Sequence, residues 1–358
     1  MATLTIEPKK VLSNIRKLDK FLVSKGIQWS LITKMTMGDR QVLEKILSDS
    51  YIKNLHSIGD ARLSNLKMIK EINPELETIY IKPPAIKYVK SIIDYADISL
   101  NTTESTIIEL DKAARAAGKT HKVIVMIEMG ELREGVLRDK ILSFYEKIFQ
   151  LENIDIIGLG TNLGCMYGVE PTNDKLIQLS LYKLLLEQKF KKQIPFVSGG
   201  SSITLPLINK KFPKEVNHFR IGETAFHGVN LIDGTQFRNL TLDAFVFTAE
   251  IIELERKDNV PDGIIGDANI GHTADYNEDE IKFTYKAIVD FGTIDVDTND
   301  LKCLDETIKF VGTTSDMTVF DLGNNRNNYK VGDVLKFKPN YMATARLMNS
   351  KYITKIIK

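Results

Sequence analysis

The sequence predicts an α/β fold, a (β/α)8 TIM barrel followed by a C-terminal all-β domain. Through the first two-thirds of the 358 residues, eight short β-rich runs alternate with segments of helical period. Eight parallel strands with intervening helices close a barrel of this type. After about residue 231 the helical period stops, and β-rich runs follow one another across turn-rich links. We therefore expect a barrel over residues 1–232 and a β domain over residues 233–358.

The expected barrel is preceded by a helix over residues 8–24. Its strands cover residues 29–33, 55–58, 78–81, 97–100, 122–127, 155–160, 195–198 and 217–221. The intervening helices cover residues 39–48, 63–72, 85–95, 104–117, 137–150 and 174–188, and a shorter one follows residue 201. Asn, Thr and Asp residues, which favour helix N-caps, stand at the start of the helices near residues 104 and 174.

The C-terminal third has a different pattern. Its expected strands cover residues 245–256, 282–290, 307–311, 318–321 and 334–337. Turn-rich segments link them, at residues 260–263 and 323–328, and no long amphipathic helix is expected there. A stretch of roughly 120 residues is an ordinary size for a domain.

Composition excludes several classes of protein. The 48 basic and 47 acidic residues give a net charge of +1, which disfavours a nucleic-acid binder or a polybasic membrane anchor. The N-terminus lacks the apolar region of a secretory signal, and no run of eighteen apolar residues occurs. Cys165 and Cys303 are the only cysteines, and the five histidines form no HExxH motif, so we expect no disulfide framework and no metal site. This pattern fits a reducing cytoplasm.

Candidate site residues follow the ends of the expected strands, where barrel sites form. Lys34 follows the first strand, and an amine desolvated in the barrel mouth could form a Schiff base. The alternative is a lysine that extends to solvent, and a class I aldolase barrel could also use such a lysine. Arg133 follows the fifth strand on a glycine-flanked loop, and Asn162 follows the sixth. Their alternatives are a surface charge and a turn residue.

A glycine- and serine-rich turn follows the seventh strand at residues 198–202 and includes Ser201 and Ser202. Hydroxyls and helix N-terminal N–H groups there would suit a phosphate, and phosphate sites recur after strands seven and eight. Arg220 ends the eighth strand, and Gly222 can present a bare N–H. The alternative for Arg220 is a structural arginine paired with a barrel carboxylate. Together with Lys34, these residues describe a pyridoxal phosphate site.

The sequence resembles the alanine racemase-like, fold-type III pyridoxal phosphate enzymes, and within them the alanine/ornithine racemase group. The resemblance extends over nearly the whole chain. Its most telling pieces are Thr33-Lys34, the turn at residues 198–202, the segment HFRIGETAFHG at residues 218–228, and Thr314-Ser315-Asp316.

The resemblance implies roles for the candidate residues. Lys34 would bind pyridoxal 5'-phosphate covalently and act as one of two catalytic bases. Ser201, Ser202 and the Gly222 backbone would bind the phosphate, and Arg220 would donate to the pyridine nitrogen. The same resemblance puts Arg133 near the phenolic oxygen of the cofactor, and Asn162 at the position where alanine racemases carry a histidine against the ring.

Arg220 favours racemisation over decarboxylation. A guanidinium keeps its protons, so the pyridine nitrogen stays unprotonated and the cofactor is a weaker electron sink. The alternatives left open are a decarboxylase or aldolase of the same fold, and a cofactor-binding protein without turnover. The expected substrate is ornithine, with lysine or alanine next.

The second base is expected from the β domain of the partner in a homodimer, as the resemblance implies. Alignment puts Asp267 at the position of the second base, and His272 and Tyr276 are the alternatives. Racemisation needs one base on each face of the α-carbon. An acidic pocket edge (Asp267, Asp316 or Glu223) could pair with the distal ammonium of ornithine or lysine.

Overall fold

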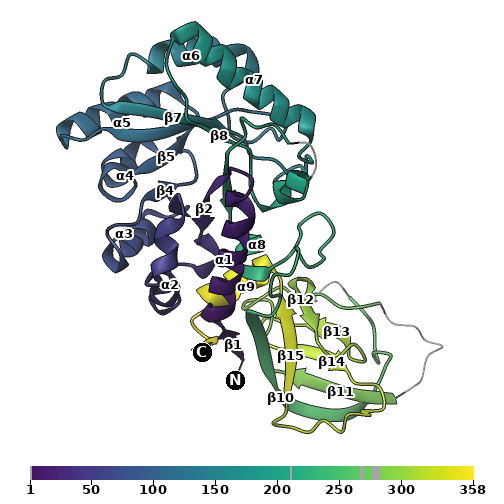
Figure 1. Cartoon of the computed structure of the whole chain (residues 1–358). Coiled ribbons are helices and arrows are strands. Elements are labelled where there is room, and N and C mark those ends of the chain that lie inside the picture. The colour runs from purple at the N-terminus through teal and green to yellow at the C-terminus, as the bar shows by residue number, and fades with distance from the viewer. Residues whose placement is uncertain (1, 210–211, 267–269, 276–282) are drawn as a thin grey trace. The chain divides into compact units, whose positions relative to one another are not determined.

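The computed structural model describes residues 2–209, 212–266, 270–275 and 283–358 (Figure 1). The chain divides into two compact units. One comprises Val11–Lys34 and Leu43–Leu242, and the other comprises Met1–Lys10, Met35–Val42 and Asp243–Lys358. The division thus follows residue 242 instead of residue 232, and the second unit also takes two segments from the start of the chain.

The first unit contains a closed parallel barrel, which confirms the predicted fold class. Within the described residues, eight strands pair in chain order and the last returns to the first. They are β2 (Gln28–Ile32), β3 (Ser57–Asp60), β4 (Thr78–Tyr80), β5 (Ile98–Asn101), β6 (His121–Met126), β7 (Ile154–Gly160), β8 (Phe196–Ser198) and β9 (His218–Ile221). Each lies within two residues of its expected bounds, because most of these strands contain short buried apolar stretches between polar segments.

Aliphatic side chains fill one side of the barrel. One buried cluster consists of Ile79, Ile98, Leu100, Ile124, Met126 and Ile157. Burying a side chain of this size contributes about 1.5–3 kcal/mol relative to leaving it exposed. This packed cluster joins β4, β5, β6 and β7 and helps to fix the position of the loops that follow them.

Helices alternate with the strands (Figure 1). They are α1 (Pro8–Val23), α2 (Arg40–Leu47), α3 (Leu63–Ile72), α4 (Val89–Tyr95), α5 (Glu104–Ala116), α6 (Ile141–Ile148), α7 (Asn173–Phe190) and α8 (Glu223–His227). The segment after residue 201 is a 3-10 helix, η5 (Ser202–Asn209), with Pro206 inside it. Proline has no N–H for a helical hydrogen bond, which limits a regular α-helix there. No helix in the described residues is long and apolar enough to cross a membrane.

The second unit contains a mainly antiparallel sheet in the order β12-β15-β10-β11-β14-β13, with β1 paired to β10 and β16. Its strands are β1 (Thr3–Ile6), β10 (Phe245–Asp258), β11 (Phe283–Val289), β12 (Leu301–Cys303), β13 (Lys309–Thr313), β14 (Thr318–Asp321), β15 (Val334–Pro339) and β16 (Thr354–Ile357). The buried rings of Phe247, Phe291 and Phe337 contact one another inside it. The unit also contains a helix, α9 (Tyr341–Asn349), capped by Asn340.

Candidate active site

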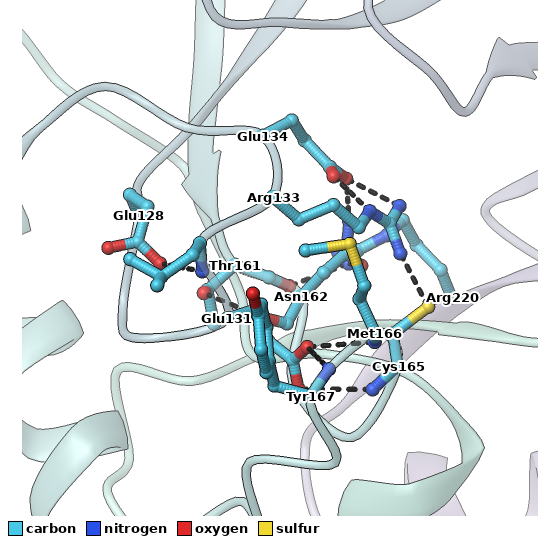
Figure 2. A network of polar contacts seen from close by, with 11 residues as sticks. Glu128, Glu131, Arg133, Glu134, Thr161, Asn162, Cys165, Met166, Tyr167 and Arg220 are labelled. Carbon is cyan, nitrogen blue, oxygen red and sulfur yellow. Dashed lines mark hydrogen bonds and ion pairs between the residues drawn. The ribbon is translucent and has the colours of Figure 1, made fainter.

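Arg220 lies on β9 with only 5% of the residue exposed. Its Nη2 donates to the Thr161 carbonyl oxygen and to Asn162 Oδ1, both at 2.7 Å, and its Nη1 donates to Ser198 Oγ. Thr161 and Asn162 directly follow β7, as Figure 2 shows beside Arg220. Among the described residues Arg220 has no direct carboxylate partner, which argues against the alternative of a simple structural ion pair.

Arg220 keeps its positive charge although the side chain is buried. Desolvation lowers the pKa of Arg220 to about 10, with Glu134 raising it and Arg133 lowering it further. A group with that pKa remains protonated at neutral pH. Arginine has five N–H donors and no acceptor, so the side chain can only donate hydrogen bonds to a ligand.

Glu134 joins two residues that the sequence predicts for the site. Arg133 donates to its carboxylate from Nε and from Nη2, the latter at 2.7 Å. Asn162 donates to the same carboxylate from Nδ2, and Arg133 Nη1 also contacts Sγ of Cys165 (Figure 2). Arg133 and Asn162, from the loops after β6 and β7, therefore lie together with Arg220 in one network.

Glu131 anchors the loop that follows Asn162. Only 2% of Glu131 is exposed, and its carboxylate accepts backbone hydrogen bonds at 2.8–3.0 Å from Cys165, Met166, Tyr167 and Val169. Burial alone would raise the pKa of Glu131, but these hydrogen bonds together hold it below its usual range. The buried carboxylate of Glu131 thus holds this loop beside the guanidinium groups of Arg133 and Arg220 (Figure 2).

In the glycine- and serine-rich turn after β8, the backbone at Gly200 passes close to the side chain of Thr204. Gly200 has φ +130°, and a Cβ there would lie 2.5 Å from Thr204 Oγ1. The Thr204 hydroxyl is buried and has no hydrogen-bond partner among the described residues. Ser202 is buried and accepts from the Thr224 backbone N–H at 3.3 Å, while Ser201 is half-buried. This set of hydroxyls and backbone N–H groups fits a phosphate group.

Lys34 follows β2, the strand that pairs with β9 next to Arg220. It opens the 3-10 helix η1 (Lys34–Thr36) just after β2, and its side chain is exposed, so the expected desolvation is not found in this chain. Burial raises the pKa of Glu223 to about 6, and the positive charge of Lys34 opposes that shift. Gly222 lets β9 approach β2, because a Cβ there would lie 3.0 Å from the Ile32 carbonyl oxygen.

The candidates for the second base belong to the other unit. Asp267 and Tyr276 lie outside the described residues. His272 is exposed, and its Nε2 lies 3.9 Å from Asp297 Oδ1. Asp316 is also exposed, and its carboxylate accepts from the Ser315 hydroxyl at 3.1 Å.

The structure adds residues that sequence reasoning did not single out. Glu134 links Arg133 to Asn162, and Ser198 contacts Arg220. An acidic residue directly after Arg133 was a usable signal for the first. Ser198 was visible only as the first residue of the glycine- and serine-rich turn.

The family follows from comparison with known sequences. Residues 6–229 match the model of the alanine racemase N-terminal domain. The match covers more than half of the chain, and the chain belongs to this family. The resemblance noted from the sequence is thereby confirmed.

Named relatives extend the comparison to the whole chain. An ornithine racemase from Acetoanaerobium sticklandii is 30% identical over 354 residues, covering 98% of this chain and 98% of the relative. A lysine racemase from Thermotoga maritima is 29% identical over 354 residues, covering 99% of this chain and 97% of the relative. The alanine racemase from Bartonella henselae with covalently bound pyridoxal phosphate has the same fold, with a TM-score of 0.74. At 14% identity, it covers 100% of this chain and 99% of that structure.

Proposed function

We propose that this protein is a pyridoxal phosphate-dependent amino-acid racemase that interconverts L- and D-ornithine, with lysine as the next candidate substrate. The family supports the reaction class, and relatives that match along the whole chain are named for ornithine and for lysine. The observation that carries the proposal is the buried Arg220, which stays cationic at the end of β9.

The residues of the barrel end fit the cofactor chemically. The amine of Lys34 is available for the covalent link to the cofactor aldehyde. The phosphate can be bound by the hydroxyls of Ser201 and Ser202 and by the Gly222 N–H. Arg220 is the cationic donor for the ring nitrogen. Arg133 and Asn162 are proposed to lie beside the ring. When bound, pyridoxal phosphate supplies an electron sink that acidifies the α-proton of an attached amino acid.

Arg220 selects the reaction in this proposal. Because the guanidinium keeps its protons at neutral pH, it offers the ring nitrogen a hydrogen bond and not a proton. Negative charge on the ring is then less stabilised, which favours return of a proton to the α-carbon over loss of the carboxylate. A carboxylate in the place of Arg220 would favour the opposite outcome.

Proton transfer on two faces requires two bases. Lys34 is proposed as the first and Asp267 as the second, with His272 and Tyr276 as alternatives. We infer a homodimer in which the β unit of each chain supplies the second base to its partner, since a two-fold dimer is the commonest arrangement. A cytoplasmic location, expected from the two isolated cysteines, is part of the same proposal.

An acidic edge would distinguish ornithine and lysine from alanine. Glu223 is the best-supported member, because it lies close enough to Lys34 for their charges to interact. Asp267 and Asp316 are the other members proposed from the sequence. Neutralising Glu223 and Asp316, with Asp267 kept because it is the proposed second base, should reduce kcat/KM for ornithine much more than for alanine, and equal losses for both substrates would exclude these two residues as the selectivity element.

The first experiment is the visible absorption spectrum of the purified protein with added pyridoxal phosphate, before and after borohydride. We expect a yellow band that borohydride removes, and peptide mass mapping should then locate the reduced cofactor on Lys34. A protein that stays colourless would contradict the proposed function. A reduced adduct on another lysine would contradict the assignment of Lys34.

A further inference from the structure

A chain of buried polar side chains extends from Arg220 into the barrel wall. Arg220 Nη1 donates to Ser198 Oγ, and Ser198 Oγ lies 2.8 Å from His218 Nδ1. The other ring nitrogen, Nε2, lies 3.1 Å from Ser30 Oγ, which lies 2.7 Å from Ser57 Oγ. All of these residues are buried, with exposed fractions between 0% and 5%. They come from the adjacent strands β8, β9, β2 and β3.

Arg220, the donor at one end, fixes the direction of the first hydrogen bond. Arginine can only donate, so Ser198 Oγ accepts from Arg220, and the single hydroxyl proton of Ser198 is free to point at His218 Nδ1. In the arrangement where the Ser198 hydroxyl donates to His218, Nδ1 is the unprotonated nitrogen, and Nε2 carries the proton and donates to Ser30. Ser30 then donates a hydrogen bond to Ser57 Oγ, and the Ser57 hydroxyl lies 3.3 Å from His56 Nδ1, to which it can donate. In this arrangement the hydroxyls of Ser198, Ser30 and Ser57 each donate one hydrogen bond and accept one.

The surroundings of His218 keep its ring neutral. Burial, with His56 and Arg220 nearby, holds the pKa of His218 well below its usual range. The His56 ring meets the His218 ring edge-on with centroids 4.7 Å apart, and the Phe196 ring lies 5.5 Å away. No carboxylate contacts His218 in the part of the chain that the structure describes. An imidazolium would place a second buried cation beside Arg220 and would turn a donor toward the Ser198 hydroxyl.

We propose that His218 is a positioning residue for Arg220. By accepting a hydrogen bond from the Ser198 hydroxyl, His218 keeps a lone pair of the Ser198 oxygen directed at the guanidinium. The guanidinium group is then held in one orientation by its hydrogen bonds to Ser198, Thr161 and Asn162. The role in the reaction rests on the proposed function, in which Arg220 faces the ring nitrogen of the cofactor. A buried histidine that only fills space would have no such effect on the reaction.

Measuring the tautomer of His218 tests this hydrogen-bond arrangement directly, and the measurement needs no cofactor. The protein is labelled with 15N at histidine, and the ring resonances of His218 are identified by their loss in His218→Asn. We expect an unprotonated Nδ1 and a protonated Nε2 that do not change between pH 6 and pH 9. A protonated Nδ1, or an imidazolium in this range, would overturn the proposal whether or not the protein is a racemase.

Variants test the effect on the reaction in the protein loaded with pyridoxal phosphate. His218→Leu removes the acceptor, whereas His218→Asn keeps an amide oxygen near Nδ1. We expect His218→Leu to lower kcat by about tenfold, the size of one lost hydrogen bond in the transition state. KM should change little, and the fraction of turnovers that end in transamination should rise. His218→Asn should restore most of kcat and the wild-type fraction.

His121 provides the matched control. It is also buried, its Nε2 lies 2.7 Å from Ser99 Oγ, and burial lowers its pKa to about 4. His121→Leu should lower the unfolding midpoint about as much as His218→Leu and leave the transamination fraction unchanged. If both variants change that fraction equally, or if neither does, His218 is a structural residue only. If His218→Leu does not fold, Ser198→Ala provides the same comparison, with Ser198→Thr as its rescue. A wild-type protein that binds the cofactor but racemises nothing would contradict the proposed function alone.

Discussion

Glu131 holds the loop after β7 through four backbone hydrogen bonds. Replacing Glu131 with glutamine measures how much these hydrogen bonds stabilise the loop. The carboxylate oxygen Oε1 accepts from the Cys165 and Val169 N–H groups, and Oε2 accepts from Met166 and Tyr167. A glutamine has one acceptor oxygen, so one pair of bonds survives and the other pair faces an NH2 group. Two hydrogen bonds to a charged acceptor, at about 1.5 kcal/mol each, give about 3 kcal/mol.

Amide hydrogen exchange is the assay, because it reports the opening of each backbone N–H. A loss of about 3 kcal/mol corresponds to exchange that is about 100-fold faster for one of the two pairs. Glu128→Gln is the matched control. Glu128 accepts from Gly130 and Leu132 through Oε1 alone, at 2.6 and 2.9 Å, so the amide oxygen can replace it. Unchanged exchange in Glu131→Gln, or the same acceleration in both variants, would refute this reasoning.

Other predictions concern the barrel end. Lys34→Ala should abolish both the borohydride-sensitive absorption band and turnover, and an active variant would rule out Lys34 as the covalent link. Arg220→Glu should raise the share of decarboxylation or transamination among the products, measured by chromatography, and an unchanged product ratio would show that Arg220 does not select the reaction. Burial raises the pKa of Glu223 to about 6, so the folded state binds a proton more tightly than the unfolded state. The resulting stability is full at pH 4 and is lost as pH rises through 6. Glu223→Gln should therefore raise the free energy of unfolding by about 2 kcal/mol at pH 8 relative to its effect at pH 4, and equal effects at both pH values in urea titrations would contradict this.

The barrel could be predicted from the sequence because its strands are short apolar runs between helices of clear period. The same criterion missed β1, β12 and β16, which are three or four residues long. Barrel strands such as β4 are equally short but are buried at every residue, whereas β1, β12 and β16 are only partly buried and so give a weaker apolar signal. Their partners are also distant in the chain. Thr3 pairs with both Thr248 and Thr354, for example.

The candidate site was predicted in part, for a related reason. Residues that follow strands could be read along the chain, and the structure brings Arg133, Asn162 and Arg220 into one network. What the sequence does not contain is which strands lie side by side. His218 and Ser30 are 188 positions apart, and they meet only because β9 pairs with β2 when the barrel closes.

Incubation of the loaded protein with L-ornithine in heavy water tests the central claim most directly. The products are separated by chirality, and deuterium at the α-carbon is measured by mass spectrometry. Two-base racemisation predicts that L- and D-ornithine approach equal amounts and that the D-form carries one deuterium at the α-carbon. Formation of the decarboxylated diamine, or D-ornithine without deuterium, would contradict two-base racemisation in which the bases exchange protons with solvent.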